Sequence, residues 1–165
     1  MSFVYLSLGT NLGERKLNLK SAIKEIGALG SIDQISSIYE TEPWGFSSEN
    51  KFLNMVIEIQ TNIPASQLIK ECLNIEAILG RTRGSALGYE SRIIDIDILF
   101  FGNEVVKSDE LTIPHPHIQD RRFILKPLSE IAPNFLHPFL GKTISELLLI
   151  CSDQCSVQKI GKIVF

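Results

Sequence analysis

The sequence predicts an α+β fold, a ferredoxin-like split βαβ sandwich whose mainly antiparallel sheet has helices packed on it. Between residues 3 and 101 the apolar periodicity runs strand, helix, strand, strand, helix, strand, which is the order of the split βαβ motif. The last of these segments, residues 92–101, is apolar and β-branched apart from two aspartates, so it is expected to be a buried strand. We expect helices on one face of the sheet and the C-terminal third on the other.

Glycines and apolar spacing divide the first half of the chain. A strand over residues 3–8 leads into a glycine-containing turn, and the next helix carries apolar residues at helical spacing until Gly30, which is expected to end it. A second strand is predicted over 35–41, followed by a loop. A third strand is predicted over 52–61, where residues alternate between two faces. Its core face carries Leu53, Met55, Ile57 and Ile59.

The second half begins with a helix that Pro64 opens and Gly80 ends, because proline suits the start of a helix and glycine its end. The aspartate-containing strand follows, and Gly102-Asn103 indicates a hairpin whose returning arm is 104–106. The remaining predicted segments are a loop over 111–122, a partly helical stretch over 123–131, a helix over 143–151 and a final strand over 157–165.

Length and composition exclude several classes of protein. At 165 residues the chain is expected to form one domain, residues 1–165. A net charge of −3 gives no basic footprint for nucleic acid or an anionic membrane, and no apolar run is long enough to span a bilayer. No basic segment precedes the first strand, so no signal peptide is expected. The three cysteines are odd in number and match no metal spacing, so we expect reduced thiols and a cytoplasmic protein. The protein is also expected to be a monomer.

Asp95 and Asp97 are the first candidate functional residues. Residues two apart on a strand point to the same side, so the two carboxylates share one face, while Ile94, Ile96, Ile98 and Phe100 are expected on the other. Neighbouring carboxylates repel each other, and a divalent cation relieves that repulsion. Oxygen ligands on a strand suit Mg²⁺, which takes further ligands from substrate phosphates. The alternative is a solvated strand face that carries two acids.

Basic residues flank this strand on both sides. Arginine is suited to phosphate because its planar fork bonds two oxygens at once. Carboxylate-held Mg²⁺ with convergent arginines is typical of phosphoryl transfer. The chain has no P-loop or protein-kinase motif, and ordinary surface arginines are the alternative. The residues concerned are Arg81, Arg83 and Arg92 before the strand and His115, Arg121 and Arg122 after it.

Phe52 and Asn54 form a second candidate pair on the non-core face of the third strand. An exposed aromatic ring beside an amide can stack on a flat heterocycle and hydrogen-bond its edge. The alternative is an aromatic side chain packed under a loop. His115 and His117 have a spacing that zinc could use, but the intervening prolines and the lack of a nearby third ligand favour a phosphate donor or a loop histidine.

Most of the chain, from residue 4 to residue 133, resembles the 6-hydroxymethyl-7,8-dihydropterin pyrophosphokinase family of folate biosynthesis. The most specific part of the resemblance is an arginine three residues before the Asp-x-Asp pair, followed by a Pro-His loop at the spacing seen here. The matching segments are residues 8–13, 39–45, 52–54, 75–83, 92–99, 111–116 and 121–128.

The resemblance implies transfer of the terminal pyrophosphate of ATP to the hydroxymethyl group of the reduced pterin, with release of AMP. It implies two Mg²⁺ ions held by Asp95 and Asp97, with Asp97 as the candidate acceptor of the hydroxyl proton and Arg81 and Arg92 as further catalytic residues. The implied ATP-binding residues are Glu76, Arg81, Tyr89, Arg92, Ile98, Thr112, His115 and Arg121. The implied pterin-binding residues are Thr41, Pro43, Trp44, Phe52, Asn54, Asp95 and Phe123. Residues 83–91 are implied to be a mobile lid.

The chain departs from the pattern at three positions. Tyr89 stands where some members carry tryptophan, Leu73 where some carry a polar residue that meets the nucleotide, and Glu110 where some carry a basic residue. These changes bear on ATP affinity and lid contacts rather than on the metal ligands.

Two other interpretations of the function compete with the pyrophosphokinase. A palm-like nucleotidyltransferase would need a basic channel, which this acidic chain lacks, and a small-ligand regulatory module would not need the acids and arginines together.

Overall fold

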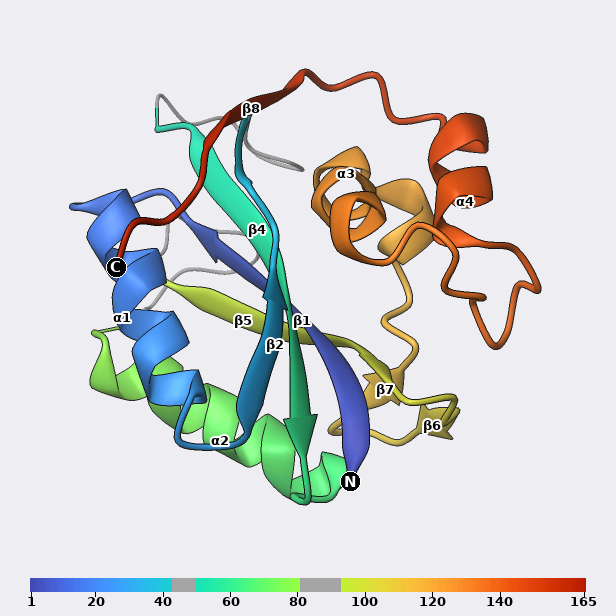
Figure 1. Cartoon of the computed structure of the whole chain (residues 1–165), viewed down its shortest axis with the longest axis horizontal. Helices are drawn as coiled ribbons and strands as arrows, with labels where there is room; N and C mark the ends of the chain where they lie inside the picture. Colours follow the sequence, from blue (N-terminus) through green and yellow to red (C-terminus); the bar gives the residue numbers. More distant parts are fainter. Residues whose placement is uncertain (43–49, 81–92) are drawn as a thin grey trace.

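The computed structural model describes residues 1–42, 50–80 and 93–165 (Figure 1). The elements are, in chain order, β1 (Ser2–Thr10), α1 (Arg15–Ile26), β2 (Ser31–Ile35), β3 (Ile38–Thr41), β4 (Phe52–Thr61), α2 (Ala65–Ile78), β5 (Asp95–Phe101), β6 (Val106–Lys107), β7 (Thr112–Ile113), the 3-10 helix η1 (Ile118–Asp120), α3 (Arg122–Ile131), α4 (Ile144–Ile150) and β8 (Val157–Gly161).

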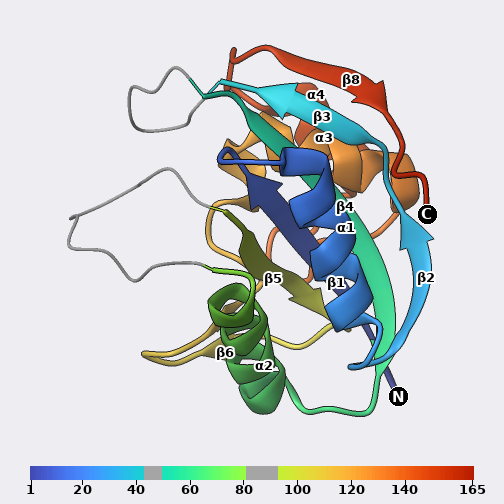
Figure 2. The same cartoon turned by 90° about the vertical axis from the view of Figure 1, so that its left-hand side faces the viewer.

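The main sheet has the strand order β5-β1-β4-β3-β8, with β2 also paired to β4, and its strands all pair antiparallel. Helices α1 and α2 cover one face, and α3 covers the other (Figures 1 and 2). The predicted α+β sandwich with a split βαβ order is therefore confirmed. The predicted placement of the C-terminal third is also confirmed, since α3 and α4 lie opposite α1 and α2.

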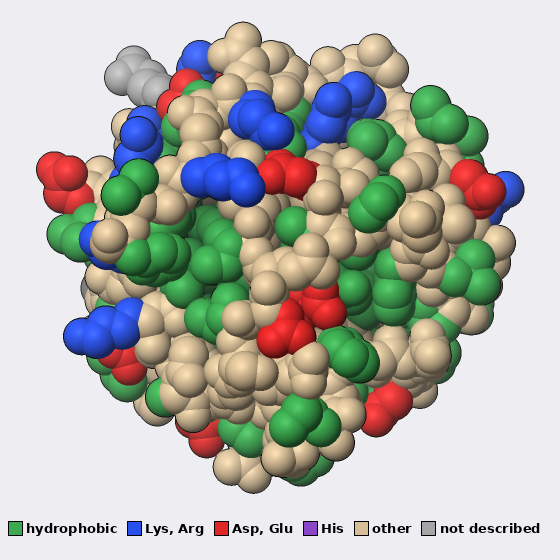
Figure 3. Space-filling model, in the orientation of Figure 1, with side chains coloured by type: hydrophobic (Ala, Val, Ile, Leu, Met, Phe, Trp, Pro, Cys, Tyr) green, Lys and Arg blue, Asp and Glu red, His purple; other side chains and the backbone are tan. Residues whose placement is uncertain are grey.

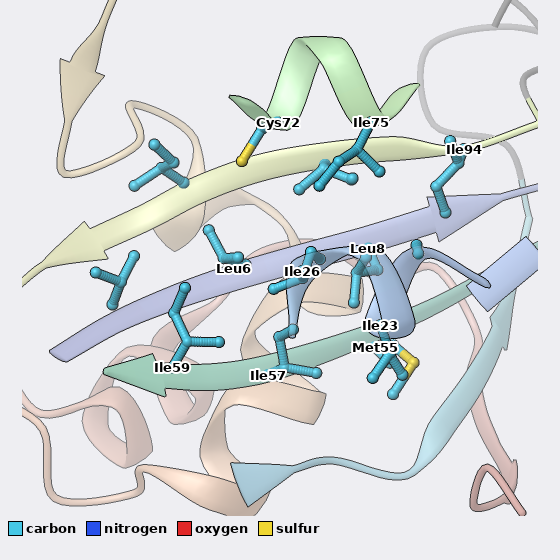
Figure 4. Close-up of a cluster of buried hydrophobic side chains, with 14 of the residues drawn as sticks. Leu6, Leu8, Ile23, Ile26, Met55, Ile57, Ile59, Cys72, Ile75 and Ile94 are labelled. Carbon is cyan, nitrogen blue, oxygen red and sulfur yellow. The ribbon is translucent and has the colours of Figure 1, made fainter. Parts of the chain in front are cut away.

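Two apolar clusters bury both faces of the sheet. On the first face, alternate residues of β1 and β4 meet α1 and α2, as Figure 4 shows for Leu6, Met55, Ile23 and Cys72. On the second face, Tyr5, Val56 and Phe100 pack against α3 and α4. The alternation predicted for β4 is confirmed, because Leu53, Met55, Ile57 and Ile59 lie in the first cluster while Val56, between them, lies in the second.

The single strand predicted over 35–41 is wrong, because Ser36 and Ser37 divide it into β2 and β3. The Ser36 hydroxyl accepts a 2.9 Å hydrogen bond from the Val56 N–H and donates one of 2.8 Å to the Ser37 carbonyl. These local side-chain bonds replace ladder bonds, which lets the chain step from one pairing register to the next.

The end of α1 also differs from the prediction, since the helix ends at Ile26 and not at Gly30. Gly30 has another role, because a Cβ atom there would collide with the carbonyl oxygen of Gln60. The chain therefore needs glycine where it passes closely over the end of β4. Gly80 does end α2 as predicted: it follows the C-cap residue Leu79 and has a positive φ of 98° that suits glycine.

β5 contains a bulge that the sequence pattern did not predict. Leu6 pairs with Ile98 and Tyr5 with Phe100, so Leu99 is the extra residue. The bulge moves Phe100 away from Ile94, Ile96 and Ile98 to the face of the aspartates, and the predicted position of Phe100 was wrong.

The predicted return of 104–106 along β5 is also wrong, because β6 pairs with β7 instead. A turn does form after β5, with the Glu104 N–H bonded to the Phe101 carbonyl. The outer edge of β5 is occupied by other donors and acceptors: the Glu76 carboxylate accepts from the Ile96 N–H, and the His115 N–H bonds the Leu99 carbonyl. An arm returning on this edge would have to displace both.

Hydrophobic side chains reach the surface as well as filling the core. Figure 3 shows one continuous hydrophobic area on the side where Figure 1 places α1 and β2. A groove there is lined in part by Leu17, Ile32, Ile35 and Phe165. Within residues 1–42, 50–80 and 93–165, no helix has the length and apolar character needed to cross a membrane.

Candidate active site

The two aspartates lie on the second face of the sheet, opposite small residues of the neighbouring strand. Asp95 pairs with Gly9 and Asp97 with Ser7, so both carboxylates lie on one face, as predicted. Both are partly exposed. Because Gly9 has no side chain and that of Ser7 is short, the neighbouring strand β1 does not crowd the two carboxylates.

Glu76 holds the backbone between the aspartates. Its Oε1 accepts a 2.8 Å hydrogen bond from the Ile96 N–H, and its side chain reaches this point from the last part of α2. Glu76 is only 2% exposed. The structure therefore places this implied ATP-site residue at the edge of β5, where it bonds the backbone between the two aspartates.

His115 and Arg121 are brought to the same end of the sheet. The His115 N–H donates a 3.0 Å bond to the carbonyl of Leu99, the bulge residue of β5. Its Nδ1 accepts a 3.1 Å bond from the His117 N–H, so the neutral ring carries its proton on Nε2. Burial, with Arg121 and His117 adding to it, lowers the pKa of His115 to about 4, and Asp95 opposes the shift. At neutral pH His115 is thus an uncharged donor near a carboxylate and a guanidinium.

Phe52, Asn54 and Thr41 form a third group beside the aspartates. The Asn54 Nδ2 donates a 2.8 Å bond to the Thr41 hydroxyl, which orients the amide. Gly9 separates Asn54 from Asp95 across the strands, and a Cβ on Gly9 would lie 3.0 Å from the Asn54 Oδ1. Asn54 is buried, at 8% exposed, whereas the aromatic side chain of Phe52 is partly exposed beside it.

Helix α3 borders this group of side chains. Phe123, in its first turn, is partly buried against the second apolar cluster. The Arg121 guanidinium carbon lies 5.8 Å from the centre of the Phe123 ring, and Arg121 is 7% exposed. A cation over an aromatic face is a favourable contact, and it places the predicted phosphate ligand Arg121 next to the predicted pterin-stacking residue Phe123.

Of the other predicted site residues, the structure describes Ile98 and Thr112. Ile98 is 2% exposed in the first apolar cluster, so only its backbone can face a ligand, and Thr112 is exposed on β7. Among the described residues, no group of three His, Cys, Asp or Glu side chains is arranged to hold a metal. The predictions for Pro43, Trp44, Arg81, Tyr89, Arg92 and the lid over 83–91 lie outside the described residues.

Two features of the site were missed from the sequence. Gly9 lies between Asp95 and Asn54 across the strands. Residues 8–13 belong to the family resemblance, but the resemblance did not indicate that Gly9 would lie between these two side chains. Glu130 accepts hydrogen bonds from Ser37 and Tyr39, which lie more than ninety residues away along the chain. No local sequence pattern could have paired residues so far apart.

Comparison with known proteins identifies the chain. Residues 5–133 match the family model of 7,8-dihydro-6-hydroxymethylpterin-pyrophosphokinase, abbreviated HPPK. This chain belongs to the HPPK family. The family and the class of enzyme, a pyrophosphokinase that acts in folate biosynthesis, are as the sequence predicted.

Individual HPPK relatives are similar over nearly their whole length. The 2-amino-4-hydroxy-6-hydroxymethyldihydropteridine pyrophosphokinase of Porphyromonas gingivalis is 43% identical over 141 residues, covering 84% of this chain and 95% of that protein. The protein of the same name from Aquifex aeolicus is 37% identical over 146 residues, covering 88% and 90%.

Solved structures support the HPPK fold. A crystal structure of an HPPK-DHPS in complex with substrates superposes with a TM-score of 0.69 at 16% identity, and the match covers 90% of this chain. The Plasmodium falciparum HPPK-DHPS with pteroate gives 0.68 at 18% identity. This chain spans less than half of either structure, 43% and 44% of their chains.

Proposed function

We propose that this HPPK family member transfers the terminal pyrophosphate of ATP to the hydroxymethyl group of 6-hydroxymethyl-7,8-dihydropterin, releasing AMP, as a step of folate biosynthesis. The observation that carries the proposal is the sheet face on which Asp95 and Asp97 lie beside Asn54, with His115 and Arg121 at its edge. An acidic pair, phosphate donors and a pocket for a flat ring are the three parts that this reaction needs.

Asp95 and Asp97 fit a site for two Mg²⁺ ions. The donor set consists of carboxylate oxygens, which Mg²⁺ prefers, and the small residues opposite leave space for phosphates as further ligands. Bound Mg²⁺ would neutralise charge on the phosphates during transfer. The Glu76 bond to Ile96 keeps the two carboxylates at a fixed spacing on the strand.

His115 and Arg121 would bind the phosphates of ATP. Arg121 offers a permanent charge, and the neutral His115 offers its Nε2–H without adding charge of its own. By resemblance, Arg81 and Arg92 would add two further guanidinium groups. Together these donors would hold the β-phosphorus in line with the attacking hydroxyl, because positioning and charge neutralisation dominate this chemistry.

Phe52, Asn54, Thr41 and Phe123 would hold the pterin. With its Nδ2 bonded to Thr41, Asn54 keeps its Oδ1 as an acceptor for an N–H on the ring edge. Phe52 and Phe123 come from a strand and from a helix that covers that strand, so they can bracket a flat ring.

The transfer step joins the hydroxymethyl oxygen to the β-phosphorus and breaks the bond from that phosphorus to the bridging oxygen, which leaves on AMP. The hydroxyl proton passes to the Asp97 carboxylate, which lies on the same face of the sheet as the proposed pterin site.

The decisive experiment incubates the purified protein with ATP, Mg²⁺ and the reduced pterin and separates the nucleotides. AMP should form in step with the pterin diphosphate, and the Asp97→Asn variant should form neither. Formation of ADP would indicate a simple kinase. Release of free pyrophosphate with a nucleotide joined to an acceptor would indicate a nucleotidyltransferase, and either result would overturn the proposal.

A further inference from the structure

Helix α3 forms one wall of the proposed pterin pocket, so whatever holds this helix also sets the width of the pocket. Phe123 lies in its first turn and Arg121 directly precedes it. The chain leaves α4, passes over α3 and enters β8 at the edge of the sheet (Figure 1). This last segment lies beyond residue 133, where the match to the HPPK family model ends.

Asp153, in this segment, holds the N-terminal end of α3. Its Oδ2 accepts a 3.0 Å hydrogen bond from the N–H of Arg122, the first residue of the helix, and its Oδ1 accepts one of 3.0 Å from the Cys155 N–H. The first N–H groups of a helix have no partner inside the helix, and a carboxylate there is also favoured by the helix dipole. No capping side chain comes from Arg121, the residue before the helix. Asp153 therefore replaces a local cap with a long-range one.

Glu130 holds the opposite end of the same helix. Its Oε1 accepts hydrogen bonds from the N–H and the hydroxyl of Ser37, at 2.9 and 2.8 Å, and its Oε2 accepts a 2.7 Å bond from the Tyr39 hydroxyl. Lys159 on β8 lies 3.8 Å from the same Oε2. The N-terminal end of α3 is thus tied to the segment that leads into β8, and its C-terminal end is tied to Ser37, to β3 and to β8.

β3, whose Tyr39 donates one of these bonds, also carries Thr41 of the proposed pterin site. Tyr39 pairs with Asn54, and Thr41 pairs with Phe52 on one side and with Val157 of β8 on the other. The spacing between Phe123 on α3 and Phe52 on β4 is therefore set through Glu130, Asp153 and β8, and not only by apolar packing.

We propose that residues 152–161 form a brace that fixes α3 over the sheet, and that Asp153 and Glu130 are positioning residues for pterin binding. The inference rests on the proposed function. It adds residues that would not touch substrate, one of which lies in the C-terminal segment beyond the family match.

The test compares Asp153→Ala with Thr143→Ala as a matched control. Thr143 caps α4 through a 3.2 Å bond from the Glu146 N–H, so both variants lose one helix cap, but α4 carries no proposed site residue. Pterin and nucleotide Kd values are measured by calorimetry, using a non-hydrolysable ATP analogue with Mg²⁺. Asp153→Ala should weaken pterin binding about tenfold, which corresponds to about 1.4 kcal/mol, and nucleotide binding less than about threefold. Thr143→Ala should leave both constants within about twofold. Asp153→Asn keeps one of the two acceptor oxygens, so its pterin affinity should lie between those of Asp153→Ala and wild type.

Three results separate the possible failures. If wild-type protein with the nucleotide analogue does not bind the reduced pterin, the proposed function is wrong and the brace is wrong with it. If wild type binds pterin but Asp153→Ala behaves like Thr143→Ala, or loses both ligands equally, the brace is wrong while the function stands. If Asp153→Ala does not fold, Tyr39→Phe is tested instead, because it removes one hydrogen bond at the other end of α3. The brace then requires that Tyr39→Phe weaken pterin binding more than nucleotide binding, and an equal change in both Kd values overturns it.

Discussion

The Glu76 carboxylate accepts a 2.8 Å hydrogen bond from the backbone N–H of Ile96, the residue between Asp95 and Asp97. Within the described part of the chain, β5 is an edge strand, and its outer N–H groups have no neighbouring strand to bond. A side chain from α2 occupies that edge at the point where two carboxylates must be held at a fixed spacing. The hydrogen bond thus links the stability of the edge strand to the geometry of the proposed metal site.

Replacing Glu76 should destabilise the fold. Glu76→Ala leaves the Ile96 N–H without its acceptor in a buried position, at a cost of about 1–3 kcal/mol in the free energy of unfolding. Glu76→Gln keeps an acceptor oxygen and should cost less. Urea unfolding of the two variants measures the difference, and equal stability of Glu76→Ala and wild type would show that the bond contributes nothing.

Asp95 and Asp97 should be needed for activity rather than for folding. Asp95→Ala and Asp97→Ala should each lower kcat/KM at least about a hundredfold, about 3 kcal/mol of transition-state stabilisation. Their unfolding free energies should not fall, because removing one of two neighbouring like charges relieves repulsion. Steady-state assays at saturating Mg²⁺ test this, with the exposed Asp109→Ala as control. Near-normal activity of either variant would remove that residue from the proposed metal site.

Phe52 and Phe123 should contribute to pterin binding and little to nucleotide binding. Phe52→Ala and Phe123→Ala should each weaken pterin binding by about 1–3 kcal/mol, the range for loss of a stacked aromatic face. Calorimetry with each ligand separates the two effects, and Phe139→Ala, an aromatic that is 75% exposed between α3 and α4, serves as control. An equal loss for both ligands would indicate a folding defect instead of a pterin site.

Gly9 should tolerate no side chain without loss of pterin affinity. The Cβ of alanine would lie 3.0 Å from the Asn54 Oδ1, so the amide must shift away from the orientation that Thr41 sets. Gly9→Ala should therefore raise the pterin Kd severalfold, while Ser7→Ala on the same strand face should not. Calorimetry on the two variants provides the comparison, and unchanged affinity in Gly9→Ala would mean that Asn54 does not contact the pterin.

His115 should make the free protein less stable as the pH falls below neutrality. Burial, together with Arg121 and His117, lowers the folded-state pKa of His115 to about 4 from its ordinary value of 6.5. Between these values the unfolded chain binds the proton more readily, so stability is lost as the pH drops from about 6.5 towards 4. Urea titrations across this range should show a flatter pH dependence for His115→Gln. An identical slope in the variant would show that His115 is not held neutral.

The sequence by itself determined the fold class, the family and the class of enzyme. Period-two and helical apolar spacing are local properties, so strand β4 and helix α2 were predicted almost residue for residue. The two aspartates share a face for the same local reason. Even so, local periodicity failed at Ser36 and Ser37, where side-chain hydrogen bonds split a strand, and at Leu99, where a bulge reversed the face of Phe100.

Only the tertiary structure decided what lies next to these elements. Glu76 on the edge of β5, Gly9 between Asp95 and Asn54, and Asp153 and Glu130 at the two ends of α3 all depend on contacts between residues far apart in the chain. The physical reason is that a buried donor or acceptor must find a partner wherever the folded chain brings one. Sequence spacing predicts which way a side chain points, but the partner it meets is set by how the layers pack.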